Sequence, residues 1–307
     1  MRVAVTGAAG RLGRALVEAL EAAPFTGPAG PVAWGRDAFD LDAPGGIGER
    51  LDRERVEAVV HAAAWTDVDG CALDPAAADR RNGAATGALA DACAPRGIDL
   101  IVISTNEVFG RERTDGEGWR TDDRPAPANP YAASKLAGER AAEAAYSRSG
   151  TGQLAIVRTA WLFGPGKPDF PMKILRAAVA AVQAGEPLRV VGDEWGNPTY
   201  TSDLADAIVD VLGSGTVAGR WHVVNGRFAS RAHWAMDTIA RAGVDVTFEE
   251  VPLATWSRPS TPPRWGVLAP TPLPSGEPLR PWRDAMADYA PALLRAHARA
   301  RQTGAAP

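Results

Sequence analysis

The sequence predicts an α/β fold built on a doubly wound parallel sheet. Short runs of β-branched and apolar residues read as buried strands, and alanine-rich stretches with apolar residues at helical spacing separate them. A glycine-rich turn follows the first run. Strands that are apolar throughout are typical of parallel sheets covered on both faces, so we expect helices on both sides of this sheet.

The first half of the chain contains most of the predicted elements. The predicted strands are Arg2–Val5, Val32–Trp34, Ala58–His61, Leu100–Ile103 and Leu154–Arg158. The predicted helices are Arg11–Ala22, Ala76–Ala94 and Tyr131–Ser147. After about residue 161, prolines interrupt the alternation and tryptophans recur. We expect a first domain over residues 1–160, rejoined by about 200–225, and mainly a smaller lobe over 161–307 that closes over a ligand; a proline-rich surface wrap is the alternative.

Composition excludes several classes of partner. The net charge of the 307 residues is −4, and no basic stripe of the kind that binds nucleic acid is present. No apolar run approaches the roughly 18 residues of a membrane helix. The two cysteines, Cys71 and Cys93, have neither disulfide nor metal spacing, and no metal site is expected. We therefore expect a cytoplasmic protein without nucleic-acid or membrane partners; a homodimer stays open.

The turn after the first strand has the features of a dinucleotide site. Gly7, Gly10 and Gly13 stand at GxxGxxG spacing, with Arg11 and Leu12 between the last two. Gly7 permits a tight turn, Gly10 lets the backbone approach a pyrophosphate, and Gly13 allows close helix packing. Because a strand precedes and a helix follows, the turn predicts a Rossmann-type domain, against the alternative of a glycine-rich turn without nucleotide.

The end of the second predicted strand bears on the choice of cofactor. Arginine there accommodates the 2′-phosphate of NADP, whereas an acidic residue binds the ribose of NAD. Arg36 directly follows Trp34-Gly35, and Arg11 could add a second charge. We expect NADPH, with NADH as the open alternative.

A tyrosine and a lysine four residues apart open the helix after Asn129-Pro130. Tyr131 and Lys135 lie on one helical face. The ordinary tyrosine pKa is near 10, and lowering it to about 7 requires roughly 4 kcal/mol, part of which the lysine charge could supply. Thr105, at the end of a predicted strand, could hydrogen-bond the oxygen that accepts the proton.

These segments together resemble the extended short-chain dehydrogenase/reductases, most closely the dTDP-4-dehydrorhamnose reductase group. The resemblance covers nearly the whole chain and rests on VTGAAGRLG, VVHAAAWTDVDGC, ISTNEVFG, NPYAASKLAGE, RTAWLFG and GNPTYTSDLA. It implies hydride transfer from a nicotinamide to C4 of a nucleoside-diphosphate 4-keto-6-deoxyhexose, with Tyr131 protonating the alkoxide, and catalytic roles for Thr105, Tyr131 and Lys135. It also implies that Ala62, Ala63, Ala64, Asp40 and Leu41 contact the cofactor, and that Thr66, Val68 and Trp161 face the sugar.

One departure from the family leaves the sugar open. Asn106-Glu107 stands where the reductases usually have Asp-Tyr, and where the related 4,6-dehydratases have an acidic pair that eliminates water. Asn106 cannot donate a carboxylic proton, and Glu107 could hydrogen-bond a sugar hydroxyl. Two other functions remain: a 4-epimerase with tightly held NAD, and a non-catalytic NADP-binding subunit similar to the regulatory subunit of methionine adenosyltransferase.

Overall fold

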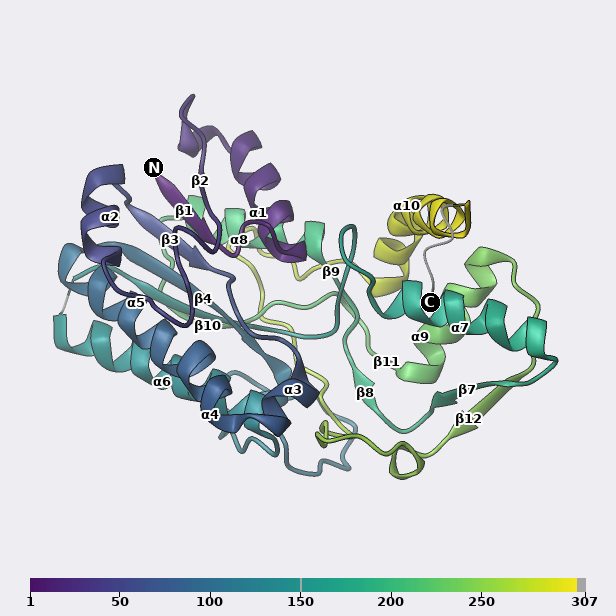
Figure 1. The fold of residues 1–307 in the computed structure, drawn as a ribbon. Helices are drawn as coiled ribbons and strands as arrows, with labels where there is room; N and C mark the ends of the chain where they lie inside the picture. Colours follow the sequence, from purple (N-terminus) through teal and green to yellow (C-terminus); the bar gives the residue numbers. More distant parts are fainter. Residues whose placement is uncertain (150, 303–307) are drawn as a thin grey trace.

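The computed structural model describes residues 1–149 and 151–302, and its larger lobe is built on a six-stranded parallel sheet (Figure 1). The strand order is β10-β5-β4-β3-β1-β2. The strands are β1 (Val3–Thr6), β2 (Val32–Trp34), β3 (Ala58–His61), β4 (Asp99–Thr105), β5 (Leu154–Thr159) and β10 (Gly219–His222). The predicted fold class, a Rossmann-type doubly wound α/β sheet, is confirmed.

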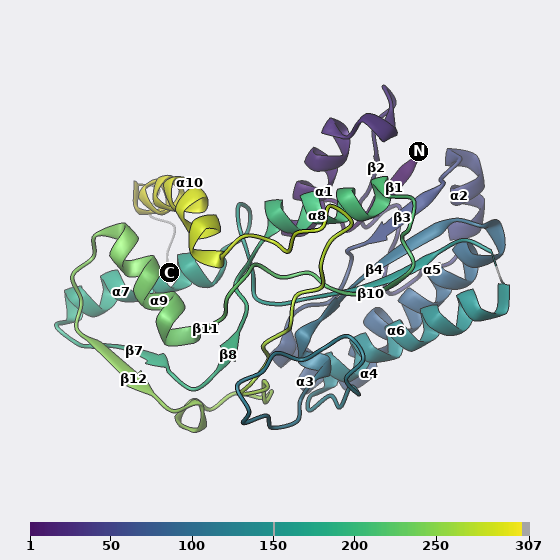
Figure 2. The ribbon, with the colours of Figure 1, turned by 180° about the vertical axis from the view of Figure 1, so that it is seen from behind.

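Alternating residues of the strands supply two cores, one on each face of the sheet. Val3 and Val5 of β1 point to the face covered by α1 (Arg11–Ala22) and α8 (Thr201–Gly213). Ala4 points to the opposite face. The helices on that face are α2 (Ile47–Glu54), α5 (Ala85–Cys93) and α6 (Pro130–Ser149) (Figures 1 and 2). Because side chains alternate along a strand, strands apolar at every position need helices on both faces.

The order of the strands creates a crevice at the carboxyl ends of β1 and β3. From β1 the chain moves outward to β2 at one edge, and it then returns to place β3 on the other side of β1. Ligands of open parallel sheets bind where the strand order reverses in this way.

The predicted helix over 76–94 is not one continuous α-helix. It consists of α4 (Pro75–Ala78), a π-helical turn over Asp79–Ala84, α5 and a 3₁₀ turn over Ala94–Arg96. Such π-helical turns inside helices occur frequently at functional sites. The expectation of an uninterrupted helix was wrong because apolar spacing does not report this local change of hydrogen bonding. The short α3 (Val68–Leu73) precedes this region.

Most of the chain beyond β5, apart from α8 and β10, forms a second group of elements beside the sheet (Figure 2). Its helices are α7 (Phe170–Ala184), α9 (Arg231–Ala242) and α10 (Trp282–Gln302). Its short strands pair as β6 (Leu162–Phe163) with β9 (Thr199–Tyr200), β7 (Leu188–Val191) with β12 (Phe248–Val251), and β8 (Trp195–Gly196) with β11 (Ala229–Ser230). Its core includes the buried Phe163, Trp234 and Trp282, and we call this group the C-terminal lobe.

None of the helices in the described part of the chain is long and apolar enough to cross a membrane.

Candidate active site

The glycine turn after β1 packs closely against the segment after β3 and against the first turn of α1. Gly7 has a φ of +65°, and a Cβ there would lie 2.9 Å from Ala63. A Cβ on Gly13 would lie 2.2 Å from the Gly7 carbonyl oxygen. Helix α1 begins after Gly10 without a side-chain cap, so its first N–H groups face the crevice. This turn therefore fits a pyrophosphate, which such amides and the helix dipole would hold.

Arg11 and Leu12, which follow Gly10, have different surroundings. Leu12 is buried in the core between α1 and the sheet. Arg11 donates hydrogen bonds to the carbonyl oxygens of Gly164 and Lys167, and its guanidinium lies 3.4 Å from the Asp169 carboxylate. Its charge is thus engaged with the loop that enters the C-terminal lobe rather than with the end of β2.

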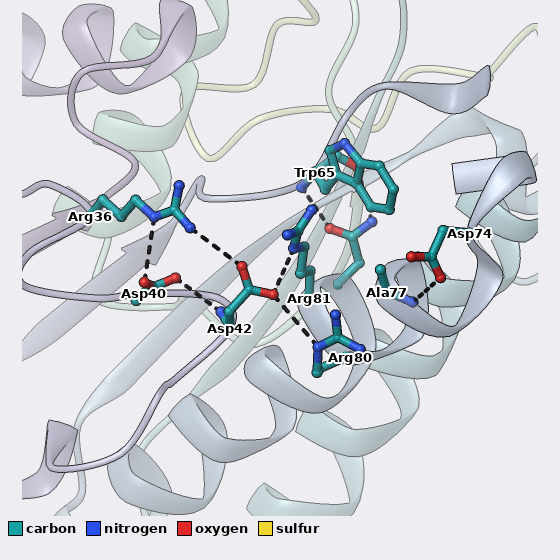
Figure 3. Close-up of polar contacts among 9 residues, drawn as sticks. Arg36, Asp40, Asp42, Trp65, Asp74, Ala77, Arg80 and Arg81 are labelled. Carbon is teal, nitrogen blue, oxygen red and sulfur yellow. Dashed lines mark hydrogen bonds and ion pairs between the residues drawn. The ribbon is translucent and has the colours of Figure 1, made fainter. Parts of the chain in front are cut away.

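The end of β2 carries a row of charged side chains (Figure 3). The Arg36 side chain is 78% exposed and lies 3.4 Å from Asp40 and 3.3 Å from Asp42. Leu41, which lies between these two aspartates, packs against the core. A cavity of about 220 Å³ lies beside Arg36 and Asp40. Arg36 and Asp40 therefore share the edge of the crevice at which a dinucleotide's adenosine would lie.

The three alanines after β3 are half-buried and face the glycine turn. Ala63 donates its N–H to Thr6 Oγ1 at 3.1 Å. Thr6 Oγ1 is also 2.8 Å from Nδ1 of His61, whose Nε2 is 3.1 Å from Thr86 Oγ1. Burial lowers the pKa of His61 to about 3, and the charge of Lys135 lowers it further. His61 is therefore a neutral core histidine with both ring nitrogens in hydrogen-bonding contact with threonine hydroxyls.

Thr105, Tyr131 and Lys135 are brought together at the carboxyl end of β4. All three are buried, with exposed fractions of 6%, 9% and 4%. Thr105 is the last residue of β4, and its hydroxyl is within hydrogen-bonding reach of the Tyr131 phenol. Burial lowers the pKa of Lys135 to about 8. The arrangement places a phenol and an alcohol at one point of the crevice, with an amine one helical turn along α6.

The expectation that Lys135 lowers the pKa of Tyr131 was wrong for this structure. Burial raises the pKa of Tyr131 well above its ordinary value, and the nearby charge of Glu107 raises it further. The hydrogen bond from Thr105 acts in the opposite direction but does not compensate. Tyr131 is therefore protonated at neutral pH, the form that a general acid needs.

Asn106 and Glu107 occupy two different environments. The Asn106 amide donates to the Gly266 carbonyl oxygen at 2.8 Å, which fastens the end of β4 to a distant loop. Glu107 Oε2 accepts from Asn129 Nδ2 at 2.7 Å, and burial raises the pKa of this carboxyl. Glu107 is within electrostatic reach of Tyr131 and of Arg231 in the C-terminal lobe. Its charge therefore acts on both the phenol and an arginine of that lobe.

The three residues expected to face the sugar are spread over the site. Thr66 is exposed, and Val68 of α3 packs beside Tyr131 and Cys71. Trp161 has a φ of +45°, its ring stacks on that of Trp234, and the Arg231 guanidinium lies 3.6 Å from its centroid. Val68 thus adjoins the phenol, whereas Trp161 belongs to an aromatic stack in the C-terminal lobe.

Two further groups support the site, and the sequence did not single them out for these roles. Asn82, in the π-helical turn, accepts from Trp65 N at 2.8 Å and donates to Ser134 Oγ at 3.1 Å. It therefore ties the loop after β3 to the helix of Tyr131. The Glu139 carboxylate holds Arg158 through contacts of 3.0 and 2.7 Å and accepts from Ser104 Oγ at 2.5 Å.

A cavity of about 480 Å³ is lined mainly by the C-terminal lobe, with Asp69 of α3 at its edge. Its charged lining comes from distant segments of the chain, so no local motif in the sequence marks it. The charged lining residues are Asp69, Asp169, Lys173, Arg189, Glu194, Arg231 and Arg258.

Comparisons with known proteins agree with this geometry. The family model described as the RmlD substrate binding domain matches residues 1–294. A dTDP-4-dehydrorhamnose reductase of Streptomyces griseus is 35% identical over 298 residues, covering 94% of this chain and 93% of the relative. A probable dTDP-4,6-dihydroxy-2-methyloxan-3-one 4-ketoreductase of Streptomyces antibioticus is 33% identical, with complete coverage of both chains.

Two solved structures share the whole architecture. A dTDP-4-dehydrorhamnose reductase from Clostridium acetobutylicum has a TM-score of 0.84 and 26% identity, covering 95% of this chain and 99% of its own. The Bacillus anthracis dTDP-4-dehydrorhamnose reductase, solved in complex with NADP, has a TM-score of 0.83 and 26% identity, with 94% and 98% coverage. The chain therefore belongs to the RmlD family, the dTDP-4-dehydrorhamnose reductase family of the extended short-chain dehydrogenase/reductases.

Proposed function

We propose that this chain uses NADPH to reduce the C4 ketone of a nucleoside-diphosphate 4-keto-6-deoxyhexose. The observation that carries the proposal is the meeting of Thr105, Tyr131 and Lys135 at the carboxyl end of β4, in the same crevice as the glycine turn. Relatives named as 4-keto sugar-nucleotide reductases over the full chain length support the same chemistry.

Tyr131 is the proton donor in this proposal. When bound, the nicotinamide supplies the hydride that C4 accepts. Tyr131 then gives its phenolic proton to the oxygen, and Thr105 hydrogen-bonds that oxygen and holds it in line. An alkoxide is a stronger base than a phenolate, so the raised pKa of Tyr131 still permits the transfer. Lys135 would hydrogen-bond a ribose hydroxyl of the cofactor and hold it next to the phenol.

The remaining predicted residues divide between the two ligands. On the cofactor side we place the glycine turn with Arg11 and Leu12, the end of β2 with Arg36, Asp40 and Leu41, and the segment Ala62, Ala63 and Ala64. On the sugar side we place Thr66, Val68, Glu107 and Trp161, with Asn106 fixing the wall. We propose that residues 161–307 form mainly the substrate-binding lobe, in which Arg231 and Arg258 would meet the diphosphate.

A spectrophotometric assay tests the proposal. Purified protein should oxidise NADPH with at least one member of a panel of 4-keto-6-deoxyhexose nucleotides, and the panel identifies the preferred sugar. NAD that stays bound through purification, with interconversion of 4-epimers and no net NADPH consumption, would instead establish the epimerase. Absence of turnover across the panel, together with stable capture of a partner enzyme, would establish the regulatory subunit.

The two cysteines support a proposal about the cellular compartment of the reaction. Cys71 and Cys93 are both free and buried, which fits a reducing compartment, so we place the reaction in the cytoplasm. We further propose a homodimer, which light scattering on the purified chain would test.

A further inference from the structure

Asp42 is the point at which the charged row beside β2 converges. Arg36, Arg80 and Arg81 lie within 3.3, 3.5 and 2.7 Å of its two carboxylate oxygens (Figure 3). Asp42 also donates its backbone N–H to Asp40 Oδ1 at 3.0 Å, which fixes the two carboxylates relative to each other. One carboxylate thus shares three guanidinium groups from two separate segments of the chain.

The three arginines do not hold Asp42 equally. Arg81 makes the short bond and keeps the pKa of Asp42 below its ordinary value, with Arg80 adding a smaller effect. Arg36 lies 3.3 Å from Asp42, against 2.7 Å for Arg81, and its side chain is far more exposed than that of Arg81, 78% against 30%. Asp42 is therefore chiefly the partner of Arg81 and only loosely that of Arg36.

Arg81 is itself held in place on its other side. Its guanidinium lies 4.9 Å from the centre of the Trp65 ring, a cation–π contact. The backbone of Trp65 is bonded in both directions to the Asn82 side chain. The bond from Arg81 to Asp42 therefore spans from the anchored π-helical turn to the loop that carries Arg36, and it draws Asp42 toward that turn.

We propose that Asp42 and Arg81 set the preference of this chain for NADPH over NADH without contacting the 2′-phosphate themselves. The proposal rests on the NADPH use and the Arg36 role given under the proposed function. The Asp42 carboxylate competes with the 2′-phosphate for Arg36 and repels that phosphate. Arg81 reduces this competition, because its ion pair holds Asp42 away from Arg36. Removing Asp42 should therefore strengthen binding of the 2′-phosphate, and removing Arg81 should weaken it.

Calorimetric binding of 2′,5′-ADP and 5′-AMP measures this preference without turnover. Asp42→Asn should raise the ratio of the two affinities about three- to five-fold, the size that a partly exposed charge pair gives. Arg81→Gln should lower it by a similar factor, and Arg81→Lys, which keeps the charge, should return it toward the original value. The double variant should match Asp42→Asn alone, because Arg81 acts through Asp42.

A matched control variant separates a specific effect on the cofactor preference from general effects on the fold. Asp52→Asn breaks a comparable exposed pair with Arg96, at 2.9 Å on α2, and should leave the ratio unchanged. Asp42→Asn should change KM for NADPH and not kcat.

Three results would overturn the inference: a shift of the ratio in the same direction for Asp42→Asn and Arg81→Gln, an Arg81→Gln effect that persists without Asp42, or no shift in either variant. If Arg36→Ala removes the preference while these variants leave it unchanged, the inference falls and the proposed cofactor role stands. If Arg36→Ala leaves the preference unchanged, both the inference and the proposed cofactor role of Arg36 are wrong.

Discussion

The buried ion pair behind the candidate site offers a sharp test of the packing. Arg158 of β5 and Glu139 of α6 are each only 2% exposed and are joined by two hydrogen bonds, of 3.0 and 2.7 Å. Replacing Arg158 with Met would leave the buried Glu139 carboxylate with one hydrogen-bond donor, the Ser104 hydroxyl, and only the weaker electrostatic influence of Lys135. An unpaired buried charge costs about 3–5 kcal/mol. We expect the free energy of unfolding to fall by that amount, and the thermal midpoint by roughly 10 °C.

The assay is urea unfolding followed by two probes, whose agreement checks that one transition is measured. Arg148→Met is the matched control, because Arg148 pairs with Asp91 at a similar 2.7 Å with both side chains more than 60% exposed. That variant should lose less than about 1 kcal/mol. Adding Glu139→Leu to Arg158→Met should recover part of the stability, since the orphaned charge is then gone. A loss below about 1 kcal/mol for Arg158→Met alone would refute the reasoning.

Three other predictions concern the catalytic centre, its support and its pH dependence. Tyr131→Phe should lower kcat by about 10²–10⁴-fold while calorimetric binding of 2′,5′-ADP is unchanged; equal turnover would exclude Tyr131 as the acid. Asn82→Ala should cost about 1–3 kcal/mol in urea unfolding, because both backbone groups of Trp65 lose their partner; an unchanged midpoint would contradict this. His61, with its pKa of about 3, stays neutral when folded but binds a proton below pH 6.5 when unfolded, so stability falls as pH drops from 6.5 towards 3. Its share of the loss at pH 5 is about 2 kcal/mol; His61→Gln should flatten the slope of the melting temperature against pH, and an unaltered slope would exclude His61 as its source.

Local patterns predicted most helices and strands of the first half of the chain well. The helix over Arg11–Ala22 has the predicted bounds, because its apolar spacing and the glycine turn before it lie within one short segment. The five predicted strands match β1 to β5 to within one or two residues for the same reason, whereas β10 and the short strands of the C-terminal lobe were not predicted. Tyr131 and Lys135 share one face of α6, as their spacing predicts, and Thr105 at the carboxyl end of β4 lies beside Tyr131.

Features that depend on residues far apart in the chain could not be predicted from the sequence. The π-helical turn contains Asn82, whose bonds reach Trp65 and Ser134, 17 and 52 residues away. The pKa of Tyr131 moves opposite to expectation because burial raises it, and the charge of Glu107 raises it further. Asp42 and Arg81 lie 39 residues apart, so spacing alone could not pair them.

The bonds from Arg11 limit how the two lobes can move. Arg11 is the first residue of α1, directly after the glycine turn. Its guanidinium donates hydrogen bonds to the carbonyl oxygens of Gly164 and Lys167. A swing of the C-terminal lobe that carried this loop along would pull directly on the phosphate-binding turn. Because Arg11 also contacts Asp169, any opening that spares the turn must bend beyond Asp169, so that entry of a bulky sugar nucleotide need not loosen the dinucleotide.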